Sequence, residues 1–85
     1  MRRYTLAQLD ALRCVVRHRT FQAAADQLNV TQPTISLRLR ELEAIVGVQL
    51  LRRRGGRGEL TAEGMVFYQH VETLQKTLNE MEAAA

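Results

Sequence analysis

The stretch that decides the fold covers residues 20–46 and reads TFQAAADQLNVTQPTISLRLRELEAIV. Its first part predicts a short helix after Thr20, because a threonine hydroxyl can cap a helix N-terminus. Four residues at i, i+3, i+4 and i+7 form one apolar face of this helix: Phe21, Ala24, Ala25 and Leu28. Asn29 follows, and asparagine tolerates the left-handed conformation that ends helices.

The second part of the stretch predicts a longer helix. Thr31 is placed to cap it, and Pro33 fits its first turn, where backbone amides have no helical acceptor. Gly47 ends this helix, and its buried stripe is expected to comprise Ile35, Leu39, Leu42 and Val46. Two helices joined by a very short turn are typical of a helix-turn-helix, whose second helix enters the major groove of DNA.

The flanking segments predict one more helix and a hairpin. Thr5 and Gln8 match a capping box for a helix that ends near His18, which leaves Arg19 to form the corner. After Gly47, short apolar pieces flank a run rich in arginine and glycine, which predicts a β-hairpin with a basic tip. We therefore expect residues 1–60 to form a winged helix-turn-helix, an all-α dominated fold of three helices plus a small β-hairpin wing.

Residues 61–85 predict a long linker helix that begins at Thr61. Its apolar residues alternate spacings of four and three, which is a heptad seam. We expect this helix to dimerise, because a domain of 85 residues is small and association would add stability. The residues assigned to the dimer contact are Phe67, Val71, Leu74, Leu78 and Met81.

The charge of the chain is unevenly spread. Residues 1–64 hold eleven arginines and six acidic residues, whereas residues 65–85 hold one lysine and three glutamates. A basic domain followed by an acidic tail indicates a polyanionic partner.

Composition excludes several other classes of protein. Cys14 is the only cysteine, so no internal disulfide can form, and His18 and His70 lack the spacing of metal ligands. We expect Cys14 to be a small core residue. A catalytic pair of Cys14 and His18 is disfavoured, because Cys14 lies in an apolar stretch and no third group would orient the pair. No apolar run reaches the roughly 18 residues of a membrane helix. The expectation is a cytoplasmic protein that is not an enzyme, with no cofactor or metal in this chain and no membrane partner.

The outward face of the predicted recognition helix suits the edges of base pairs. Gln32 is the best candidate for base reading, since an amide can pair with both exposed groups of adenine. Arg40 suits a phosphate, and the wing arginines suit a narrow minor groove. The residues assigned to DNA binding are Thr31, Gln32, Pro33, Thr34, Ser36, Leu37, Arg40, Arg53, Arg54 and Arg57.

Each of these assignments has a simpler structural alternative. Gln32 can serve only as part of the helix cap, and Thr34 and Ser36 can be ordinary surface hydroxyls. Arg40 can be a solvated cation that pairs with Glu43, and the wing can be a solvated basic loop. Arg38, nearer the buried stripe, is expected to form an ion pair or to pack through its aliphatic stem.

The run from Phe21 to Ser36 resembles the helix-turn-helix of LysR-type transcriptional regulators. The resemblance continues through Leu42-Glu43, Gly47, Leu50-Leu51, Arg53, Leu60-Thr61 and Gly64, so that it covers nearly the whole chain. It implies sequence-specific binding to an inverted-repeat operator in bacteria, as a dimer joined by antiparallel linker helices. It also implies a larger co-inducer-sensing domain in the full-length protein, of which this chain resembles the DNA-binding fragment. By position, it assigns base reading to Gln32, Pro33 and Ser36, and a groove or phosphate contact to Arg53.

Three positions depart from the family pattern. Arg19 stands where the family has glycine, and Leu37 stands where it has a basic residue, so we expect Leu37 to contact a thymine methyl group instead. The second wing arginine of the family would fall at Gly56, whereas this chain has Arg57.

Two other functions compete with binding of an operator. One is a protein-interaction module in which the coiled-coil helix is the working part and the basic head is incidental. The other is an RNA-binding winged helix, which is disfavoured because few aromatic residues are available to stack on bases.

Overall fold

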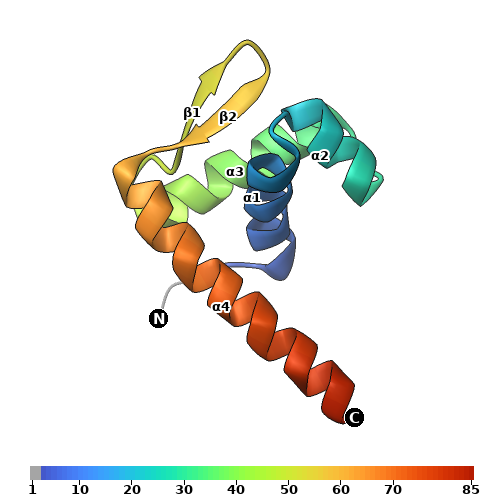
Figure 1. The fold of residues 1–85 in the computed structure, drawn as a ribbon. Coiled ribbons are helices and arrows are strands. Elements are labelled where there is room, and N and C mark those ends of the chain that lie inside the picture. The colour runs from blue at the N-terminus through green and yellow to red at the C-terminus, as the bar shows by residue number, and fades with distance from the viewer. Residues whose placement is uncertain (1–2) are drawn as a thin grey trace.

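The computed structural model describes residues 3–85 as four helices and one hairpin (Figure 1). In chain order the elements are α1 (Leu6–His18), α2 (Phe21–Leu28), α3 (Gln32–Val46), β1 (Leu51–Arg54), β2 (Arg57–Leu60) and α4 (Ala62–Ala84). The predicted fold class, a winged helix-turn-helix followed by a long helix, is confirmed.

Threonine begins all four helices, as their sequence context predicts. The side chains of Thr5, Thr20, Thr31 and Thr61 each accept a hydrogen bond from the backbone N–H three residues on. At α1 the capping box is complete, because the N–H of Thr5 also donates to Oε1 of Gln8 at 3.0 Å. These caps satisfy amides that the helices leave without partners, and they fix where each helix starts.

Left-handed residues end the first three helices. Arg19, Asn29 and Gly47 have φ angles of 73°, 55° and 87°. Asparagine and glycine tolerate this conformation, but an arginine there is strained by its Cβ. The irregular corner expected at Arg19 is therefore present.

The core lies where α1, α2 and α3 meet. Its largest fully buried side chains are Phe21, Leu12, Ile35, Leu42, Leu50 and Val15. Ala24 and Ala25 are completely buried, and their small size lets α2 approach its neighbours closely. Leu28 and Val46, predicted as core residues, are only partly buried at its edge.

The wing is the β-hairpin that the sequence predicts, but its tip is not basic. Leu51 pairs with Leu60, and Arg54 pairs with Arg57, so the arginines lie within the two antiparallel strands. Only Gly55 and Gly56 form the tip, with φ angles of 54° and 82°. Two glycines at positive φ make a two-residue turn, which lets the flanking arginines continue the strands.

The first half of α4 belongs to the core of the helix-turn-helix. Val71 is 4 % exposed and is part of the cluster that α1, α2 and α3 build, and Phe67 packs against that cluster. Val71 therefore has little surface left for a dimer partner, and its assignment to the dimer seam stays a prediction. Helix α4 joins this core beyond residue 60. The domain boundary that the sequence places at residue 60 stays a prediction.

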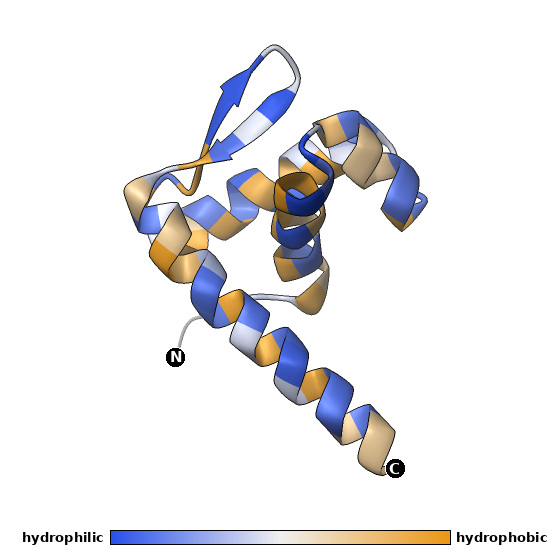
Figure 2. Ribbon diagram, in the orientation of Figure 1, coloured by the Kyte–Doolittle hydropathy of each residue, from blue (hydrophilic) through white to orange (hydrophobic). Residues whose placement is uncertain are grey.

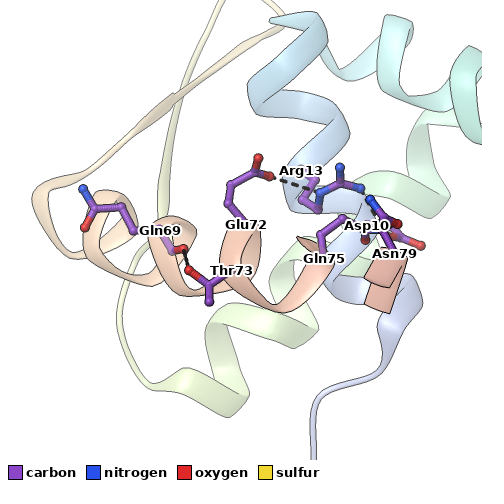
Figure 3. Close-up of polar contacts among 7 residues, drawn as sticks. All are labelled: Asp10, Arg13, Gln69, Glu72, Thr73, Gln75 and Asn79. Carbon is purple, nitrogen blue, oxygen red and sulfur yellow. Dashed lines mark hydrogen bonds and ion pairs between the residues drawn. The ribbon is translucent and has the colours of Figure 1, made fainter. Parts of the chain in front are cut away.

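The second half of α4 projects past the other helices, on the side away from the wing (Figure 1). Its apolar residues alternate with hydrophilic ones along the whole helix (Figure 2). Where the two halves meet, Nε of Arg13 on α1 donates to Oε1 of Glu72 at 3.1 Å (Figure 3). This ion pair ties α4 to α1 at the edge of the core.

Candidate nucleic-acid interface

The first turns of α3 present the side chains that the sequence assigns to base reading. Gln32 and Pro33 are exposed, Ser36 is half-buried, and Leu37 is 48 % exposed. The opposite face of the helix is fixed in the core, where Ile35 and Leu39 are 0 % and 2 % exposed. The buried face sets the rotation of α3, so these side chains point away from the protein.

Thr31 and Thr34 have a structural role in addition to the assigned contact. Their hydroxyl oxygens lie 2.9 Å apart, and the N–H of Thr34 donates to Oγ1 of Thr31. One hydroxyl proton is therefore used inside the cap, which leaves one for an external acceptor. The hydrogen bonds of this cap join Thr31 and Thr34 and do not include the Gln32 side chain, in contrast to the alternative that Gln32 serves only the cap.

Among residues 3–85, the arginines on α3 and the wing form no ion pair with a carboxylate. Within residues 3–85 the ion pairs are those of Arg13 with Asp10 and Glu72, on the far side of the core. The possible pair of Arg40 with Glu43 is not formed, and Arg38 is half-buried without an ion pair. The positive charge of these elements is thus available to an anion.

Arg53 has a second contact that sequence reasoning missed. Its guanidinium lies 4.2 Å from the centroid of the Phe21 ring, and Phe21 is 1 % exposed. A cation over the face of an aromatic ring is held by the ring's quadrupole. The residue remains exposed, so the edge of the guanidinium can still donate hydrogen bonds.

The wing is fastened to the corner between α1 and α2. The N–H of Phe21 donates to the carbonyl of Gly56 at 3.0 Å, and Thr20 forms an isolated bridge with Arg57. A Cβ at Gly58 would lie 2.6 Å from Cγ1 of Val15, so only glycine fits this approach. The wing therefore has a fixed position relative to the helix-turn-helix.

Glu43 fastens the other end of the wing. Its carboxylate accepts hydrogen bonds from the N–H groups of Leu50 and Leu51, at 2.6 and 3.1 Å. The hydroxyl of Thr61 donates to the carbonyl of Gln49 at 2.7 Å. Glu43 thus links the recognition helix to the first wing strand through charge-assisted hydrogen bonds. No local sequence signal predicts this contact, because it joins residues seven and eight positions apart through a turn.

The second half of α4 leaves an apolar stripe uncovered. Leu74 and Met81 are 41 % and 62 % exposed, and Leu78 is half-buried. Leu6 of α1, which is 58 % exposed, lines the same groove as Leu78. These side chains are available to a second helix.

Cys14 has the structural role that the sequence predicts. It is a free, buried cysteine, and burial raises the pKa of its thiol, so that the reactive thiolate is disfavoured. In the part of the chain that is described, no group of His, Cys, Asp and Glu could hold a metal ion. None of the described helices is long and apolar enough to cross a membrane.

Comparisons with known proteins agree with this geometry. Residues 6–65 match the family model described as bacterial regulatory helix-turn-helix protein, lysR family. The transcriptional regulator CfxR of Cupriavidus necator is 34 % identical over 96 % of this chain, and OxyR of Escherichia coli is 37 % identical over 89 %. The chain spans about a quarter of the length of both relatives, 26 % in each case.

Solved structures give the same result. The CbnR DNA-binding domain in a complex with DNA has a TM-score of 0.86 at 31 % identity, covering 94 % of this chain and 92 % of that one. The BenM DNA-binding domain with benA site 1 DNA has a TM-score of 0.87 at 34 % identity, covering 94 % and 90 %. The family match and these relatives, which are transcriptional regulators, show that the chain belongs to the lysR family of bacterial regulatory helix-turn-helix proteins.

Proposed function

We propose that this chain binds double-stranded operator DNA, with the first turns of α3 in the major groove and the wing near the minor groove. The observation that carries the proposal is the exposed face of α3, whose rotation is fixed by its buried stripe, beside arginines that have no carboxylate partner. The CbnR and BenM domains, whose folds match this one, were solved as complexes with DNA. The place of action would be the cytoplasm, at the bacterial nucleoid.

Different residues supply selectivity and affinity in this proposal. Gln32 pairs with an adenine edge, Ser36 donates a hydrogen bond, and Leu37 contacts a thymine methyl group. Arg40 and the wing arginines Arg53, Arg54 and Arg57 contact phosphates or the minor groove. Pro33 and the free hydroxyl proton of the Thr31–Thr34 pair complete the contact surface.

We also propose a homodimer joined through the uncovered stripe of α4. Leu74, Leu78 and Met81 are its contact residues, with Phe67 at its inner end, and the two-fold symmetry of the pair would match an inverted-repeat operator. A small-molecule co-inducer would act through a further domain of the whole protein, since the chain spans only 26 % of CfxR.

Selection of genomic fragments by the chain, followed by anisotropy titrations, tests the proposal. Gln32→Ala should cost about 1–3 kcal/mol on the selected site and little on mixed-sequence DNA. Gln69→Ala is the matched control, because Gln69 is an exposed glutamine of α4 that is not assigned to DNA binding. Equal losses on both DNAs would show that Gln32 does not read bases.

The same titrations separate the competing functions. An interaction module with an incidental basic head would show no saturable DNA binding even at low salt. An RNA-binding winged helix would be displaced from duplex DNA by RNA at lower concentrations than by competitor DNA.

A further inference from the structure

A second basic groove lies outside the recognition helix, between the carboxyl end of α1 and strand β2. Its volume is 270 Å³, and its lining comprises Val16, Arg17, Arg19, Arg57, Gly58 and Glu59. Only Arg57 among these residues was assigned to DNA from sequence. Arg17 and Arg19 are exposed, and neither enters the contact surface proposed above.

The charge of this groove is positive. It holds three guanidinium groups and one carboxylate, and none of the three arginines forms an ion pair within residues 3–85. Arg54 lies opposite Arg57 in the hairpin register, so a fourth arginine shares the face of the wing that Arg57 occupies. The negative end of α1 and the positive end of α2 meet at Arg19, so the two helix dipoles largely offset each other there.

The backbone holds the groove residues together. The N–H of Gly58 donates to the carbonyl of Arg19 at 3.4 Å, and the bridge between Thr20 and Arg57 sets the next residues side by side. These contacts position Arg19 beside β2 independently of its side chain. The guanidinium of Arg19 is therefore presented by a rigid frame.

Arg19 occupies this position at a conformational cost. Its φ of 73° favours glycine, so an arginine there loses stability, and its side chain forms no ion pair within residues 3–85. A strained cation at the rim of an unneutralised groove indicates that the charge serves a ligand.

We infer that this groove binds a phosphodiester group of the same duplex that α3 and the wing contact, with Arg19 as the principal ligand. The inference rests on the proposed function, since the wing next to Arg57 must lie against DNA. A guanidinium matches phosphate oxygens through two parallel N–H donors, and Arg17 and Arg57 add charge on either side. The contact lengthens the footprint past the wing without reading any base.

Arg19→Gly and Arg19→Asn test this inference, because both residues tolerate the left-handed conformation and both remove the charge. Affinity for mixed-sequence duplex DNA at low salt should fall about three- to tenfold. The slope of log affinity against log salt should become shallower by about 0.9 for each protomer bound. The thermal midpoint should not fall, and for Arg19→Gly it should rise by about 3 °C.

Arg3→Asn is the control, because Arg3 is exposed before α1, about 20 Å from Arg19 along that helix. An equal change in affinity and slope for Arg3→Asn and Arg19→Asn would show a net-charge effect and would overturn the inference. A lower thermal midpoint for Arg19→Gly, with an unchanged slope, would assign Arg19 a purely structural role. If inorganic phosphate binds the groove of the parent chain but both Arg19 variants bind DNA as the parent does, the groove takes a free anion, and the DNA contact is overturned. Absence of DNA binding by the parent chain would contradict the proposed function itself.

Discussion

The two halves of α4 differ in what covers their apolar residues. In the first half, Gly64 lies against the carbonyl of Leu50 and Val71 is 4 % exposed. In the second half, Leu74 and Met81 are 41 % and 62 % exposed. All four residues belong to one apolar repeat with alternating spacings of four and three. The repeat shows which side chains share a stripe, but it does not show what covers them. The chain itself covers the first half, and the second half is left for a partner.

The continuity of α4 connects these two regions mechanically. A helix of 23 residues is about 35 Å long and is stiff over that distance. Because its first half is fixed in the core and its second half is proposed to hold the dimer, the dimer contact would set the spacing of two recognition helices. The two halves can be separated by substitution, and each substitution has a distinct signature.

Gly64→Ala should have the largest effect on folding. A Cβ at this position would overlap the backbone carbonyl of Leu50, and neither backbone can move away without breaking the cap at Thr61. We expect a loss of more than about 3 kcal/mol in the free energy of unfolding, enough to unfold a domain of this size. Chemical denaturation followed by circular dichroism measures it.

Gly55→Ala is the control for this substitution. At Gly55 a Cβ would meet nothing within 4 Å, although its φ of 54° disfavours alanine. The expected loss is only about 1 kcal/mol. Similar losses for the two variants would mean that the start of α4 is not packed against Leu50 as described.

Val71→Ala should destabilise the chain without a direct effect on association. The side chain is buried in the core, so its truncation should cost about 2 kcal/mol in the free energy of unfolding. The dimer dissociation constant, measured by sedimentation under conditions where the variant is folded, should stay within about twofold of the parent value, because the Val71 side chain is buried in the core and has little surface left for a partner. A large loss of association with an unchanged thermal midpoint would return Val71 to the dimer seam.

The double substitution Leu74→Glu with Met81→Glu should have the opposite signature. Both side chains are exposed, so the thermal midpoint of the monomer should stay within a few degrees of the parent value, about 3 °C. Two buried glutamates in each helix would face one another across the seam, and we expect dimerisation to weaken by at least about tenfold. Lys76→Glu changes the net charge by the same amount on the other side of the helix and should leave the dissociation constant unchanged.

The features that the sequence predicted correctly are local ones. Four threonine caps, the exit at Arg19 and the end at Gly47 depend on residues within one helical turn, so their identities determine them. The exposed face of α3 follows from the period of its apolar residues in the same way. The positions of the wing arginines were harder to predict. The turn at Gly55 and Gly56 decides whether these arginines lie in a loop or in strands.

The features that it did not predict join distant segments. Arg53 lies over Phe21, Glu43 accepts bonds from the wing, and Arg19 lies beside Arg57; each contact depends on the angle at which the hairpin returns to the helices. Burial of Val71 depends likewise on how α4 crosses α1. One-dimensional periodicity contains no information about such angles, whereas the resemblance to a family supplied the overall arrangement.

Glu72→Gln should give the smallest effect, at the point where the two halves of α4 meet. The Arg13–Glu72 pair is partly exposed, with side-chain exposures of 16 % and 38 %, so solvent screens it and its loss should cost at most about 0.5 kcal/mol (Figure 3). Because salt weakens exposed pairs, the difference from the parent chain in thermal midpoint should shrink as salt is raised. Glu80→Gln, which removes the same charge from an exposed position without an ion pair, should show no such dependence. If Glu72→Gln instead weakens dimerisation more than it weakens folding, the orientation of the projecting half of α4 depends on this pair, and the two halves are less independent than their burial indicates.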